Sequence, residues 1–129
     1  MVIKHTSFKH GWFYHYRVHN PKTSSLTNGF ESLREFLYRV FDECPDDYFN
    51  IGPRSSSLKF NLPLDVKEVE HNELKELTTH GLNINNMRYK SNHSRVQMFM
   101  LENDQKTIAI EVPIWLKHSD INCFKNIFD

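Results

Sequence analysis

Long apolar runs are missing from this chain of 129 residues, and so are several familiar catalytic signatures. No stretch approaches the roughly 20 apolar residues that a membrane helix needs, and the first residues lack the apolar centre of a secretory signal. We therefore expect a cytosolic protein that does not enter a membrane. The sequence also has no HExxH pattern, Gly-rich phosphate loop or nucleophile elbow. These absences argue against nucleotide-driven and acyl-transfer chemistry.

Cysteine and net charge are also scarce. The two cysteines, Cys44 and Cys123, cannot form a CxxC-type set of metal ligands, and a chain of this length can form a core without disulfides. Sixteen basic and sixteen acidic residues cancel, so the strong positive field of many DNA-binding proteins is missing. The first forty residues are mainly basic, whereas residues 41–86 are acidic. This polarity suits a protein that binds two different surfaces.

Eight histidines are the most conspicuous potential metal ligands, but their spacing argues against a metal site. His15 and His19 are four residues apart in a predicted strand, which separates them by roughly 13 Å. Zinc lies about 2.0–2.1 Å from each histidine nitrogen, so these two residues cannot share one ion. We expect neither a metal nor another cofactor.

Hydrophobic periodicity predicts one α+β domain over residues 1–129, with two to three helices packed against a mainly antiparallel sheet. The predicted strands cover residues 1–8, 12–19, 57–64, 82–90, 94–102 and 106–116, and the predicted helices cover residues 31–44, 66–81 and 119–128. Residues 20–29 are predicted to form a loop. Asp65 and Glu68 fit a capping box for the second helix, and a hairpin turn is expected around Asn103 and Asp104.

The predicted strand at residues 12–19 has two different faces. Its even-numbered residues, Trp12, Tyr14, Tyr16 and Val18, suit a core, whereas its odd-numbered residues, Phe13, His15, Arg17 and His19, are mixed. If the mixed face is exposed, it can recognise a partner. The candidate partner-binding residues are therefore His15, Arg17 and His19, together with the large aromatic Trp115.

A small nuclease remains an alternative on two grounds. Asp46 follows a proline, and with Asp65 and Lys67 it matches the loose PD…D-x-K pattern, in which carboxylates hold magnesium and a lysine assists. Metal-independent RNA cleavage needs a general base and a cation near the phosphate. The second candidate set, in residues 88–95, is Arg88, Lys90, His93 and Arg95. Both sets also have structural explanations, because Asp65 of the first set can cap a helix and the second set can be an exposed polar turn.

Nucleic-acid binding without cleavage is a further alternative. Aromatic side chains that alternate with basic ones on a sheet can stack on bases, while Lys9 and Arg17 meet phosphates. Tyr14 and Tyr16 are better explained as core residues of an amphipathic strand. The neutral overall charge also weakens this interpretation.

In its size, its mass of 15.4 kDa, its expected cytosolic character and its single alanine, Ala109, the chain resembles the small host-takeover proteins of T-even bacteriophages. This resemblance implies a non-enzymatic binding protein that docks on a large host enzyme and modulates it in the host cytoplasm. It favours bacterial RNA polymerase as that enzyme. The resemblance concerns size and composition, and it assigns no functional residues.

Overall fold

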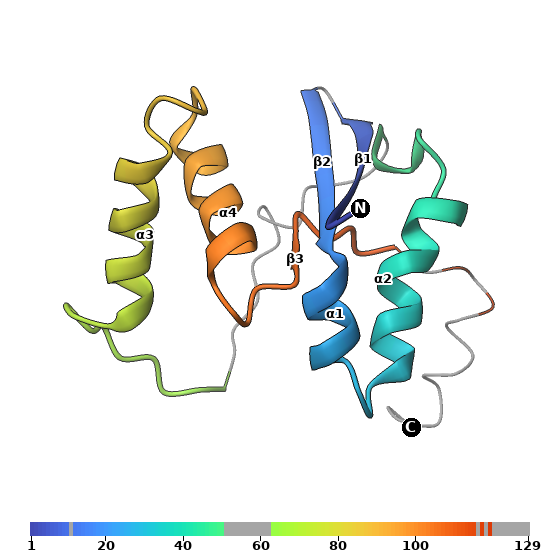
Figure 1. Ribbon diagram of the computed structural model, residues 1–129. Helices are drawn as coiled ribbons and strands as arrows, with labels where there is room; N and C mark the ends of the chain where they lie inside the picture. Colours follow the sequence, from blue (N-terminus) through green and yellow to red (C-terminus); the bar gives the residue numbers. More distant parts are fainter. Residues whose placement is uncertain (11, 51–62, 116, 118, 120–129) are drawn as a thin grey trace.

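The computed structural model describes residues 1–10, 12–50, 63–115, 117 and 119. A three-stranded antiparallel sheet lies at the centre (Figure 1). The helix of residues 31–43 lies on one side of it and the helices of residues 73–103 lie on the other, whereas the helix of residues 20–26 continues from the end of the second strand. The predicted α+β class is confirmed.

Strands β1 (Ile3–His10) and β2 (Trp12–His19) pair as an antiparallel hairpin, as their β-branched and aromatic content predicts. The register places Ser7 opposite His15 and Lys9 opposite Phe13. Opposite residues of an antiparallel pair share a face, so the even-numbered residues of both strands point one way and the odd-numbered residues the other. The described even-numbered side chains include the buried residues Phe8, Tyr16 and Val18.

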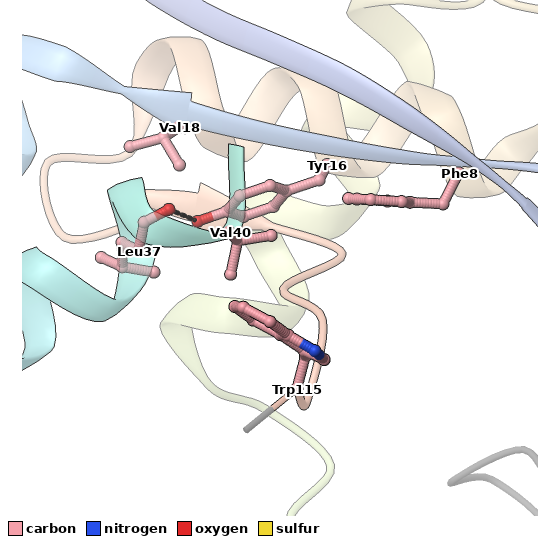
Figure 2. Packing of buried hydrophobic residues seen from close by; sticks show 6 residues of the cluster. All are labelled: Phe8, Tyr16, Val18, Leu37, Val40 and Trp115. Atoms are coloured by element: carbon pink, nitrogen blue, oxygen red, sulfur yellow. Dashed lines mark hydrogen bonds between the residues drawn. The ribbon is translucent and has the colours of Figure 1, made fainter. Parts of the chain in front are cut away.

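Helix α2 (Glu31–Glu43) covers the even-numbered face and is the most clearly predicted helix. The first core contains Phe8, Tyr16, Val18, Leu37, Val40 and Trp115 (Figure 2). Within it, the Tyr16 hydroxyl donates to the backbone carbonyl of Leu37 at 2.6 Å, which joins the strand to the helix. The 3₁₀ turn η1 (Tyr48–Asn50) adds Phe49, whose ring meets that of Phe8 edge-on at 5.5 Å.

Helices α3 (Glu73–Ile84) and α4 (Asn92–Asn103) form a helical hairpin on the other side of the sheet (Figure 1). They approach closely at Gly81, because an added Cβ there would lie 2.8–2.9 Å from the Cβ and ring atoms of Phe99. A second core of Met98, Leu101 and Ile110 joins α4 to the short strand β3 (Ala109–Ile110). Strand β3 pairs with β2, so this core ties the helical hairpin to the sheet.

Residues 20–26 form helix α1 (Asn20–Leu26), so the prediction of a loop there is wrong. Proline is favoured in a first helical turn, and the His19 side chain caps this helix by accepting from the backbone N–H of Lys22 at 3.3 Å. The Lys22 ammonium then donates to the carbonyls of Leu101 at 2.5 Å and Asp104 at 2.7 Å. Helix α1 thereby satisfies carbonyls at the carboxyl end of α4, which otherwise lack helical partners.

The strands predicted at residues 82–90 and 94–102 are also wrong. Residues 82–90 complete α3 and the turn after it, and residues 94–102 lie in α4. The Ser91 side chain accepts from the backbone N–H of Ser94 and starts α4, and Met98 and Leu101 then point to the same side because they are three residues apart. In residues 94–102 the Ser91 cap therefore favours a helix over the strand that the alternating sequence pattern predicts.

Other predicted boundaries shift as well. Helix α3 begins at Glu73 because Asn72 caps it, so the capping box at Asp65 and Glu68 is wrong. The expected hairpin turn at 103–104 is the end of α4, and the strand predicted at 106–116 is reduced to β3. Apart from residues 63, 64 and 119, the strand predicted at 57–64 and the helix predicted at 119–128 lie outside the described residues.

Candidate functional site

The open sheet face is the exposed part of the odd-numbered side of the hairpin. It consists of the exposed residues His5, Lys9 and Phe13 and the half-buried residues Ser7, His15 and Arg17. Helix α4 covers the other end of that side, where Ile3 packs against the second core. Phe13 remains 67% exposed, with the exposed Lys9 opposite it, and His5 is exposed further along the same face. The open sheet face therefore combines a free aromatic ring with a lysine, an arginine and two imidazoles.

His5 and His15 contact each other on this face. His5 Nε2 lies 3.1 Å from His15 Nδ1, and the two rings stack with their centroids 5.2 Å apart. One of the two nitrogens must carry the proton of this hydrogen bond. Partial burial, the Arg17 guanidinium and the His15 ring lower the pKa of His5. His5 is therefore neutral at pH 7, and the contact is a hydrogen bond rather than a repulsion between two imidazolium ions.

Glu111 gathers three groups at the edge of the sheet, immediately after β3. One carboxylate oxygen accepts from the backbone N–H of His15 at 2.7 Å, and the other lies 3.1 Å from His93 Nε2 and 3.4 Å from the Gln97 amide nitrogen. The backbone of Glu111 has a φ of 51°, in the left-handed region that costs a non-glycine residue about 1–2 kcal/mol. The contacts of the carboxylate offset this cost and hold the residue in place.

The contact between Glu111 and His93 orients an imidazole for proton transfer. Nε2 of His93 lies between the Glu111 carboxylate, at 3.1 Å, and the Gln97 side-chain nitrogen, at 2.8 Å. In the tautomer that donates from Nε2 to the carboxylate, Nδ1 keeps a lone pair that can accept a proton. The His93 side chain is 70% exposed, so a ligand can reach it, whereas Glu111 is only 18% exposed. This arrangement of a carboxylate behind a histidine is typical of a general base.

The residues of the PD…D-x-K pattern are not brought together. Asp46 lies in the turn after α2, whereas Asp65 and Lys67 lie in the segment before α3, on the opposite side of the molecule (Figure 1). Among the residues that the structure describes, no group of three or more His, Cys, Asp or Glu side chains is placed to hold a metal ion. These three residues therefore do not form one site.

The basic residues of the second nuclease set stabilise the connection between α3 and α4. Arg88 donates to Asn85 and pairs with Glu102 at 3.3 Å. Arg95 donates to the backbone carbonyl of Tyr89 at 2.8 Å. These interactions give both arginines a structural role.

His93 differs from the other members of this set. It belongs to the cluster at Glu111, whereas Lys90 is exposed in the loop before α4. Of the four candidates, His93 has the contacts expected of a group that transfers protons.

The four candidate partner-binding residues have different surroundings. His15 and Arg17 lie on the open sheet face, whereas His19 caps α1. Trp115 is 5% exposed and belongs to the first core, with the Arg39 guanidinium 5.8 Å from its ring. Only His15 and Arg17 are therefore placed where a partner can meet them directly.

Sequence reasoning missed the acidic–apolar segment, residues 63–76, which leads into α3. All its residues are exposed, and five carboxylates alternate with four apolar side chains that are between 58% and 87% exposed. Those apolar side chains are Leu64, Val66, Val69 and Leu74. Their alternation with charge is visible in the sequence, but Leu64 was assigned to a predicted strand and the other three to a helix predicted at 66–81.

Comparisons with known proteins give no indication of function, so the open sheet face, the cluster at Glu111 and the acidic–apolar segment are the main guide to it. No family model, curated protein or solved structure matches the chain. No helix among the described residues has the length and hydropathy needed to cross a membrane.

Proposed function

We propose that this chain is a small non-enzymatic binding protein that docks on a large host enzyme and modulates it, with bacterial RNA polymerase as the first partner to test. The observation that carries the proposal is the exposure of the acidic–apolar segment. Apolar side chains exposed in a contiguous stretch between charged residues are typical of interaction surfaces. The resemblance to host-takeover proteins supplies the partner and the compartment, the host cytoplasm.

The energetics of this segment suit a moderate interaction. Fully burying a valine or leucine side chain contributes about 1.5–3 kcal/mol. Four such side chains therefore supply a free energy similar to the roughly 4–15 kcal/mol that association costs. The surrounding carboxylates favour a partner surface with a basic rim and increase the association rate.

Helix α3 extends the same surface. A shallow depression of about 780 Å³ lies between the start of α3 and the end of α4, and Leu74, Leu77 and Met100 contribute apolar atoms to its lining. Leu74 belongs to both the depression and the acidic–apolar segment. A partner side chain can therefore enter the depression while the segment lies along the partner surface.

The test is a pull-down of tagged protein from nuclease-treated bacterial lysate, followed by binding to purified RNA polymerase. We expect stoichiometric recovery of the polymerase subunits, and at least a tenfold loss of affinity in the double variant Val66→Ser/Val69→Ser. The matched control is Val2→Ser/Ile114→Ser, which changes two side chains of similar exposure elsewhere. Failure to recover the polymerase, or full binding by the double variant, would refute the proposal.

A metal-independent ribonuclease is a second candidate, favoured by the orientation of His93 by Glu111. It predicts cleavage of labelled RNA in the presence of a chelator. General acid–base catalysis contributes about 10²–10⁴-fold, so His93→Ala should lower the rate at least 100-fold. Asp65→Ala is the matched control and should leave the rate unchanged, because Asp65 lies in the segment before α3 and outside the cluster at Glu111.

A further inference from the structure

The open sheet face has a surface chemistry that the acidic–apolar segment does not share. Its cations are Lys9 and Arg17, and the carboxylate at its edge, Glu111, is already bonded to His15, His93 and Gln97. The pairing of β1 with β2 brings the lysine and the arginine to the same side of the sheet. An anionic ligand is therefore the electrostatic complement of this face.

Aromatic rings form a continuous series on the same face. The rings of Phe13 and His15 have centroids 6.4 Å apart, and those of His15 and His5 are 5.2 Å apart. Phe13 stands at the exposed end of the series, where its ring can meet a flat ligand. Rings on a sheet between basic side chains are how several proteins stack unpaired bases and hold the backbone.

We propose that the open sheet face binds single-stranded nucleic acid. Bases stack on Phe13 and contact the exposed His5 ring, and the Lys9 ammonium and Arg17 guanidinium meet the phosphates. A duplex is a poorer ligand, because paired bases do not present their faces to a protein ring.

The binding face and the proposed docking surface are separate. The open sheet face lies on the β1–β2 hairpin, whereas the acidic–apolar segment leads into α3 at the outer side of the molecule (Figure 1). A strand of RNA or DNA and a protein partner could therefore be held at the same time. The inference does not depend on the proposed docking function, and each can fail alone.

The test is fluorescence anisotropy of the full chain with a labelled 12-nucleotide oligo-uridylate, the matching oligo-thymidylate and a duplex, over a series of KCl concentrations. We expect both single strands to bind more tightly than the duplex. Two phosphate contacts predict that log K falls against log[KCl] with a slope of about −1.4, since each contact on a single strand contributes about −0.7. Tighter binding of either single strand identifies the natural ligand as RNA or DNA.

The variants assign the interaction to named side chains. Phe13→Ala should weaken binding about 5- to 150-fold, the range for loss of one base–aromatic stack. Lys9→Ala should reduce the salt slope to about −0.7. The matched controls are Phe30→Ala, which removes a ring of similar exposure on another surface, and Lys67→Ala, which removes an exposed lysine. Both controls should retain wild-type affinity and slope.

Several results would overturn the inference. They are the absence of binding at 50 mM KCl, preference for the duplex, or equal losses in Phe13→Ala and Phe30→Ala. Loss of polymerase capture in Phe13→Ala, without any anisotropy change in the wild type, would assign the face to a protein. Retained oligonucleotide binding in Val66→Ser/Val69→Ser would show that nucleic-acid binding is independent of the acidic–apolar segment.

Discussion

Replacement of Gly81 by alanine measures how closely α3 and α4 pack. The new methyl group would lie 2.8–2.9 Å from Phe99, and one of the contacted atoms is the Phe99 Cβ. The Cβ atom is bonded directly to the backbone, so rotation of the buried Phe99 side chain about χ1 cannot move it away. Helix α3 must therefore move away from α4, or the backbone of one of them must shift.

Two effects of opposite sign determine the result. Overpacking of a well-packed contact lowers the free energy of unfolding by about 1–3 kcal/mol. Because the clash involves a Cβ atom that cannot rotate away, we expect a cost in the upper part of that range. Alanine improves helix propensity over glycine by about 1 kcal/mol. We therefore expect Gly81→Ala to lower the free energy of unfolding by about 1–2 kcal/mol.

Urea denaturation followed by circular dichroism gives this free energy directly. The control is Asn83→Ala, an exposed position on the same helix, where propensity alone should raise stability by about 0.5 kcal/mol. If Gly81→Ala stabilises the protein as much as the control does, the close packing of α3 on α4 is incorrect.

Three further predictions concern groups inside the fold. Tyr16→Phe removes the donor to the Leu37 carbonyl and should cost about 1 kcal/mol in urea denaturation. Asn85→Ala should cost about 1–3 kcal/mol by the same measurement, because the buried amide donates to the Arg95 carbonyl at 2.9 Å. Folding lowers the pKa of His5 below 6.5, so the unfolded chain binds more protons as the pH falls. The free energy of unfolding should therefore decrease from pH 7 to pH 5, and less steeply in His5→Gln.

These predictions have defined controls. Asn86→Ala, at the exposed neighbouring position, should leave stability within about 0.5 kcal/mol of the wild type. Equal losses in Asn85→Ala and Asn86→Ala would contradict the assigned role of the buried amide. A Tyr16→Phe variant as stable as the wild type would show that the hydroxyl contributes no net stability. Identical pH dependence in His5→Gln and the wild type would remove His5 as its cause.

Local sequence patterns were sufficient for the elements whose signals agree with one another. The hairpin combines β-branched and aromatic residues with strict alternation, and the helix at 31–43 combines a clear apolar stripe with a proline soon after its end. In both cases the pattern that forms the element also forms the core face. These elements make up most of the first core.

Elements that depend on a cap were misjudged. The alternation from Val96 to Leu101 is compatible with a strand, but Ser91 supplies a side-chain acceptor that starts a helix. Residues 20–26 were assigned to a loop by their polar composition, although Pro21 also fits a first helical turn. A single capping hydrogen bond is hard to weigh against composition when only the sequence is known.

The candidate site could be predicted only in part. His93, His15 and Arg17 were selected because their side chains carry the relevant chemistry. Glu111 was not selected, since its importance comes from a contact with His15 across 96 positions of the chain and from a left-handed backbone. Neither property is encoded in a local pattern.

The position of Trp115 in the first core has a consequence for synthesis on the ribosome. The other members of this core come from residues 8–40, so they leave the exit tunnel long before the tryptophan that packs against them. We expect the nascent hairpin and α2 to stay susceptible to protease until Trp115 has emerged. Limited proteolysis of stalled nascent chains tests this, and protection of chains stalled soon after residue 50 has emerged would show that the tryptophan is dispensable for closing the core.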